Sequence, residues 1–102
     1  MQRALGGLEK LWERARKVAV HGNREYNPGW HTALDLPNLL TLSEAVARSA
    51  IDRRESRGAH FREDYQAKDA ACGKVNTVVA KAADGSMQLR RVPIPPLPDY
   101  LK

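Results

Sequence analysis

The sequence predicts a mainly α-helical protein, with an antiparallel pair or small bundle of helices, then a charged loop, a β-hairpin and an extended proline-rich tail. Apolar residues recur at intervals of three and four along most of residues 2–54, which is the helical period. Asp84-Gly85 lies between two β-prone runs, an arrangement typical of a hairpin. The closing segment carries prolines that impose an extended path, namely Pro93, Pro95, Pro96 and Pro98.

The first helix is expected at about residues 2–20. Its opposite face is charged, and Glu13 precedes Lys17 by four residues, which is a favourable orientation for a helical ion pair. The sequence His21-Gly22-Asn23 is expected to end it. The predicted apolar face consists of Leu5, Leu8, Leu11, Trp12, Ala15, Val18 and Ala19.

The second helix is expected at about residues 28–54, either continuous or slightly bent at Pro37. It carries two apolar stripes, and a helix that is apolar on more than one face must be covered on more than one side. The first helix alone cannot cover both, so we expect a missing partner. One stripe contains Leu39, Leu42, Val46, Ala50 and Arg53, and the other contains Leu36, Leu40, Ser43, Ala47 and Ile51.

Length and composition predict one domain, residues 1–102, with a modest core. The formal net charge is +5 and there is one cysteine, Cys72, so no disulfide forms within the chain. The sequence has no apolar stretch of the length of a signal peptide or a membrane-spanning helix, so we expect no direct membrane insertion. The hairpin is expected at about residues 74–92 and the extended tail at 93–102.

The charged loop, residues 55–66, is the most distinctive part of the chain. It follows the long helix and contains a glycine of the kind that ends helices. Arginine side chains and carboxylates together suit internal ion pairing, so we expect a structural clasp that also takes part in docking. Arg57 is expected to pair with Glu55, with Asp64 or with a carboxylate of a missing domain. The clasp candidates are Glu55, Arg57, Gly58, His60, Arg62 and Asp64.

No catalytic, cofactor-binding or metal-binding residues are expected. The histidines and Cys72 lack the spacing of a zinc site. Ser43, His60 and Asp64 lack the strained, glycine-flanked nucleophile turn of a hydrolase. No glycine-rich phosphate-binding loop follows a predicted strand. Arg90, Pro93 and Pro96 fit an SH3-ligand spacing, although an extended tail laid over a larger enzyme is the preferred interpretation.

Two runs in the charged loop resemble a known family. Glu55-Ser56-Arg57-Gly58-Ala59-His60 and Arg62-Glu63-Asp64-Tyr65 are similar to the signature near the C-terminus of succinate dehydrogenase and fumarate reductase flavoprotein subunits. L-aspartate oxidase shares the Glu-Ser-Arg-Gly part of the signature but is not expected to share the tail. Further matching segments are Asn27-Pro28-Gly29-Trp30-His31, Leu34-Asp35-Leu36, Ser43-Glu44-Ala45-Val46-Ala47-Arg48 and Arg91-Val92-Pro93-Ile94-Pro95-Pro96.

The resemblance implies a helical C-terminal structural and docking domain of an FAD-dependent subunit. The implied partners are the flavin-binding domain of the same subunit and an iron–sulfur subunit. The implied location is cytoplasmic, at the membrane face through partner subunits. The fragment itself is expected to hold no cofactor, to catalyse nothing, to bind no nucleic acid and, when isolated, to self-associate. Two alternatives stay open: the same domain of L-aspartate oxidase, or an independent basic module that binds nucleic acid.

Overall fold

The computed structural model describes residues 2–101, which form two compact units that meet in sequence between Ile51 and Asp52. The first unit contains helix α1, Gln2–Ala15, and nearly all of helix α2, Pro28–Asp52. The second contains strands β1, Val75–Lys81, and β2, Met87–Pro93, with short 3-10 turns at Cys72–Lys74 and Asp99–Leu101. Within the described residues the helical pair and the hairpin agree with the predicted class.

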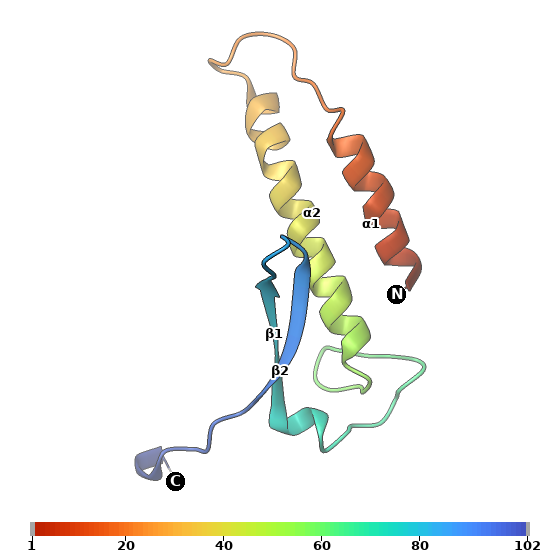
Figure 1. Ribbon diagram of the computed structural model, residues 1–102, viewed down its shortest axis with the longest axis vertical. Helices are drawn as coiled ribbons and strands as arrows, with labels where there is room; N and C mark the ends of the chain where they lie inside the picture. Colours follow the sequence, from red (N-terminus) through yellow and green to blue (C-terminus); the bar gives the residue numbers. More distant parts are fainter. Residues whose placement is uncertain (1, 102) are drawn as a thin grey trace. The chain divides into compact units, whose positions relative to one another are not determined.

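In the first unit α1 and α2 run antiparallel (Figure 1). Helix α1 ends at Ala15 and not near residue 20 as expected. Its last turn tightens through bonds from the amides of Lys17 and Val18 to carbonyls three residues back, a common way for a helix to finish. The β-branched residues that follow leave the helix, and Val20 Cγ1 lies 3.3 Å from where a Cβ on Gly29 would be.

Helix α2 is continuous, and Pro37 lies inside it. Pro28 occupies its first position, where a missing backbone N–H costs nothing. The side chain of Asn27 caps this end, since its Oδ1 accepts a hydrogen bond from the Gly29 amide at 3.0 Å. Its Nδ2 donates to the carbonyl of His21 at 2.8 Å, so one side chain fixes both the interhelical loop and the start of α2.

The core of the described residues is small. Among residues 2–101 only Leu40 and Cys72 are buried hydrophobic residues, and α1 contributes none. By contrast, the solvent-exposed fractions of Leu34, Leu39, Leu42 and Val46 on α2 are between 56% and 64%. No helix in residues 2–101 combines the length and the apolar character that crossing a membrane requires.

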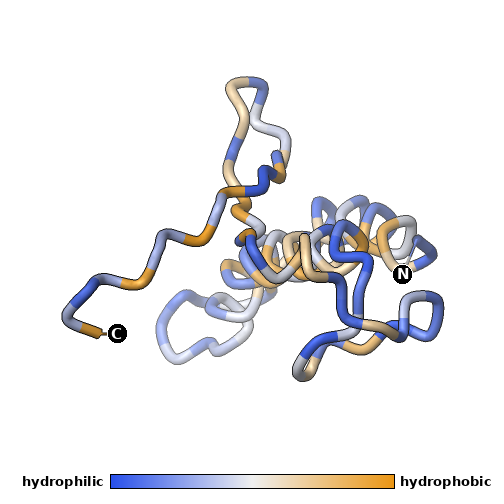
Figure 2. The backbone as a smooth tube through the Cα atoms, turned by 90° about the horizontal axis from the view of Figure 1, so that it is seen from below, coloured by the Kyte–Doolittle hydropathy of each residue, from blue (hydrophilic) through white to orange (hydrophobic). Residues whose placement is uncertain are grey.

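The second unit contains the predicted hairpin, one residue later than expected at each end. The strands are antiparallel, with Val79 opposite Leu89. The turn places Gly85 at φ 85°, a left-handed conformation that glycine adopts at little cost. The amide of Ile94 donates to the carbonyl of Lys74 at 2.9 Å, after which the tail runs extended to a short final turn. Figure 2 shows strongly hydrophobic positions along this tail separated by positions of lower hydropathy.

Candidate functional site

The charged loop forms a cluster around Glu55, whose side chain is completely buried. Its Oε1 accepts hydrogen bonds from Arg53 Nε at 2.8 Å and from Arg57 Nε at 2.9 Å. Its Oε2 accepts from Arg57 Nη2 at 3.1 Å and from the backbone amide of Asp69 at 2.8 Å. Buried carboxylates are tolerated when donors satisfy both oxygens in this way.

These donors lower the pKa of Glu55 from 4.5 to about 2, chiefly through the side-chain hydrogen bond from Arg57, against the opposing effect of burial. The pKa of Arg57 is raised for the reciprocal reason. A carboxylate with so low a pKa is a weak proton acceptor at neutral pH. Its surroundings therefore suit a structural ion pair and not general base catalysis.

A tight turn shapes the loop after Glu55. The amide of Arg57 donates to the carbonyl of His60 at 2.8 Å, and the amide of His60 donates back to the carbonyl of Arg57 at 3.1 Å. Gly58 takes φ 59° within this turn. The turn brings His60 Nε2 to 3.2 Å from the carbonyl oxygen of Arg53, so the end of α2 and the loop are joined.

Arg62 is the second buried charge of the cluster, with an exposed fraction of 8%. It forms a bidentate pair with Asp64, at 2.8 Å from Nε to Oδ1 and 2.6 Å from Nη2 to Oδ2. Its Nη1 donates to the carbonyl of Arg53 at 3.1 Å, and its guanidinium lies 4.7 Å from the ring centroid of Tyr65. The pairing lowers the pKa of Asp64.

The Ser56 hydroxyl fixes the path of the loop between these two charged centres. Its Oγ accepts from the amide of Arg62 at 2.8 Å and donates to the carbonyl of Tyr65 at 2.8 Å. Backbone groups that would otherwise lack a partner are satisfied in this way.

Residues 69–72, which precede the hairpin, also contact the cluster. Arg57 Nη2 donates to the carbonyl of Asp69 at 3.0 Å, and Arg53 Nη2 donates to the carbonyl of Cys72 at 3.2 Å. Asp69 Oδ1 accepts from the amide of Ala71 at 2.8 Å, which holds the turn that presents the carbonyl to Arg57. The loop and the entry to β1 are therefore fixed to one another.

The hairpin is tied to the cluster through its second strand. Arg91 Nε and Nη2 donate to the carboxylate of Asp52 at 3.1 and 3.2 Å, and Nη2 also donates to the carbonyl of Asp52 at 3.0 Å. Asp52 is the last residue of α2. The contact raises the pKa of Arg91.

All six clasp candidates lie in this network. Glu55 and Arg57 form one pair, Arg62 and Asp64 form the other, and Gly58 and His60 form the turn between them. Among the partners left open for Arg57, the structure shows Glu55. Six further residues of the network were not predicted. Ser56 acts over 6 and 9 residues, and the others make contacts across 14 to 39 residues, which leave no periodic signal. These others are Asp52, Asp69, Cys72, Gly73 and Arg91.

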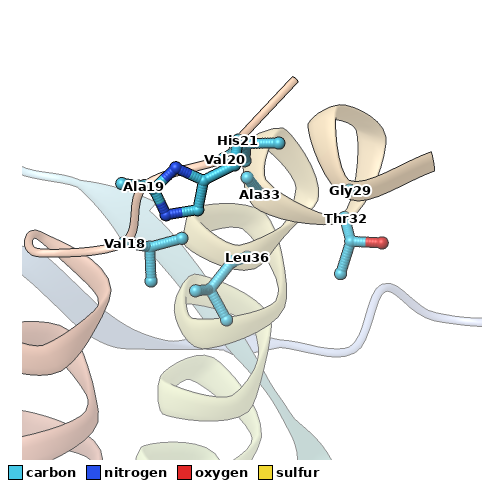
Figure 3. A pocket seen from close by; sticks show the side chains of 8 residues that line it. All are labelled: Val18, Ala19, Val20, His21, Gly29, Thr32, Ala33 and Leu36. Carbon is cyan, nitrogen blue, oxygen red and sulfur yellow. The ribbon is translucent and has the colours of Figure 1, made fainter. Parts of the chain in front are cut away.

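The described residues contain no group of three or more metal-ligating side chains. A shallow hollow in the first unit lies between the segment Val18–His21 and the first turns of α2 (Figure 3). Apart from His21 and Thr32, its lining side chains are small or aliphatic, so it offers a contact surface and no evident chemistry. The residues that line it are Val18, Ala19, Val20, His21, Gly29, Thr32, Ala33 and Leu36.

Comparison with known sequences identifies the family of the chain. A family model described as the C-terminal part of fumarate reductase flavoprotein matches residues 1–99. The chain belongs to this family. It is 39% identical over 97 residues to the succinate dehydrogenase flavoprotein subunit of Coxiella burnetii, covering 94% of this chain and 16% of that protein. No solved structure matches the chain.

Two further relatives of the chain are also flavoprotein subunits. The fumarate reductase flavoprotein subunit of Haemophilus influenzae is 30% identical over 95 residues, covering 92% of this chain and 16% of that subunit. The 8-methylmenaquinol:fumarate reductase flavoprotein subunit of Wolinella succinogenes is 37% identical over 67 residues, covering 62% of this chain and 11% of that protein. These relatives confirm the predicted family. They support neither L-aspartate oxidase nor a nucleic-acid-binding module.

Proposed function

We propose that this chain is the C-terminal structural and docking module of an FAD-dependent flavoprotein subunit that interconverts succinate and fumarate. The observation that carries the proposal is the family match over residues 1–99, together with relatives named as succinate dehydrogenase and fumarate reductase flavoprotein subunits. The chain spans 16% of the length of the first two relatives. FAD and the dicarboxylate are therefore assigned to other parts of that subunit.

The cluster around Glu55 supports a structural role. Every oxygen of the Glu55 carboxylate is occupied by a donor from within the second unit. Arg62 is held by Asp64 and a backbone carbonyl. Groups bound so completely to one another are not available to a substrate, but within the second unit they hold the loop and the hairpin in one arrangement. The clasp is proposed to keep the docking module in its binding conformation.

The proposed partners are the flavin-bearing part of the same subunit and an iron–sulfur subunit. Through such partners the assembly is proposed to lie at the cytoplasmic face of the membrane. In isolation, the uncovered apolar side chains of α2 are proposed to drive weak self-association. Sedimentation over a range of protein concentrations would detect it.

Thermal unfolding of the isolated chain with FAD or succinate at 1 mM tests the assignment of function. A ligand with a Kd of 10 µM would stabilise the chain by about 2.7 kcal/mol, which is a shift of many degrees for a chain of this size. We expect no shift with either ligand. A clear stabilisation by FAD or succinate would contradict the proposal, because it would place the site within residues 1–102.

A further inference from the structure

We infer that one face of α2, the stripe of Leu34, Leu39, Leu42 and Val46, is the surface that the flavin-bearing part of the subunit covers. This inference rests on the proposed function and names the docking surface that the function requires. Each of these side chains is more than half exposed, with exposed fractions of 64%, 56%, 63% and 62%. Exposed apolar side chains grouped on one surface are typical of interaction sites.

The four residues share one face of the helix. At about 100° of rotation per residue they fall within an arc of roughly 140°. Leu40, which is buried at 5% exposure, projects from the opposite side of α2. The helix is therefore apolar on two sides: Leu40 is buried, whereas Leu34, Leu39, Leu42 and Val46 are exposed.

Between Leu34 and Val46, two polar residues within the same arc complete the surface. Asp35 and Asn38 are both exposed, and within residues 2–101 neither side chain makes a hydrogen bond or an ion pair. An apolar patch with a few free polar groups is the usual composition of a protein interface. A complementary partner surface presents apolar side chains, a hydrogen-bonding group for Asn38 and a cationic or N–H donor for Asp35.

The flavin-bearing part of the subunit is the occupant that the observations favour. The matched relatives carry more than four fifths of their length outside the region that this chain matches, which covers 16% of each of the first two. A two-fold interface between copies would instead bring two identical stripes together, each with an unpaired Asp35. Like charges at short range oppose such a contact. We therefore expect this face to bind a second copy more weakly than it binds the flavin-bearing part of the subunit.

A binding experiment with the full chain and the flavin-bearing segment encoded in the same genome tests the inference. The variant is Leu39→Asp/Leu42→Asp. The control is Leu11→Asp, which makes one such change at an exposed apolar residue of α1. We expect the double variant to weaken binding at least about 100-fold and the control to change it less than about threefold. Circular dichroism checks that both variants stay helical.

Photocrosslinking gives a readout that does not depend on the stability of the variant. A photoreactive residue at Leu42 is expected to crosslink to the flavin-bearing segment, and one at Glu44, about 160° away around the helix, is not. Wild-type affinity in the double variant, or crosslinking from position 42 mainly to a second copy, would overturn the inference and leave the proposed function standing. No binding by the wild-type chain would instead contradict the proposed function itself.

Discussion

The guanidinium of Arg57 lies against Gly73, with Nη2 only 2.8 Å from the position that a Cβ on Gly73 would take and Cζ 3.2 Å from it. The same guanidinium holds the buried carboxylate of Glu55 and the carbonyl of Asp69. The backbone φ of Gly73 is outside the left-handed region, so the close approach of the Arg57 guanidinium, and not backbone geometry, disfavours a larger residue here.

Gly73→Ala is therefore expected to destabilise the chain, and the sign of its effect should depend on Arg57. With Arg57 present, the new methyl displaces the guanidinium from Glu55, and we expect the melting temperature to fall. In an Arg57→Ala background the clash is gone, and the lower entropy of the unfolded chain should make the same change stabilising by about 0.4–1 kcal/mol. Thermal unfolding of the four proteins of this double-mutant cycle measures the reversal. Equal effects in both backgrounds would contradict the contact.

Glu55→Gln is expected to lower the melting temperature at pH 7 by more than about 5 °C. The amide keeps the shape of the side chain but removes the charge that two arginines share, and it places a donor among donors. Arg48→Lys, in the exposed pair that Arg48 forms with Glu44 at 2.7 Å, is the control and should have little effect.

The contribution of Glu55 to stability is also expected to depend on pH. Its folded pKa of about 2 lies below the value of 4.5 taken for the unfolded chain. The stabilisation is therefore complete above pH 4.5 and is lost as the pH falls towards 2. The difference in unfolding free energy between wild type and Glu55→Gln should shrink across this window. A difference that stays constant from pH 6 to pH 2.5 would show that the charge of Glu55 is not the cause.

Arg62→Lys is expected to destabilise the chain almost as much as Arg62→Ala. Arg62 binds both oxygens of Asp64, donates to the carbonyl of Arg53 and stacks on Tyr65. A lysine ammonium cannot reproduce that fork or the stacking. Denaturant unfolding compares the two variants, and full rescue by lysine would show that charge alone is what the site requires.

The thiol of Cys72 reports on opening of the cluster. Cys72 is buried, and its carbonyl accepts from Arg53. In native conditions we expect its reaction with a maleimide to be at least about tenfold slower than in denaturant. Arg53→Ala should accelerate the native reaction by loosening the turn at Cys72. Equal rates in the wild type and Arg53→Ala would mean that this bond does not restrain the segment.

Local sequence signals predicted the elements that depend on neighbouring residues. The helical period predicted both helices and Asp84-Gly85 predicted the hairpin, because the formation of each element depends on residues close together in the sequence. The end of α1 was placed five residues too late, since Val18 and Ala19 continue the apolar period although they leave the helix. The charge pattern of residues 55–65 indicated internal ion pairs but left Glu55, Asp64 and a carboxylate of a missing domain open as the partner of Arg57, and the structure shows the contact with Glu55.

The rest of the cluster depends on contacts between distant residues. The bond from the Asp69 amide to Glu55 and the pair of Arg91 with Asp52 join residues that no periodic pattern links. The crowding of Gly73 is likewise visible only when Arg57 is in place. Such contacts follow from tertiary packing, which a single sequence does not record.

Succinate-dependent dye reduction by the flavin-bearing segment, measured with and without this chain, tests the central claim most directly. If the chain is the docking module of that subunit, adding it at a one-to-one ratio should raise the rate at least about tenfold, because the catalytic groups then take their aligned positions. Leu39→Asp/Leu42→Asp should fail to do so. A rate that the wild-type chain leaves unchanged, with both polypeptides at concentrations far above the Kd of their complex, would contradict the account.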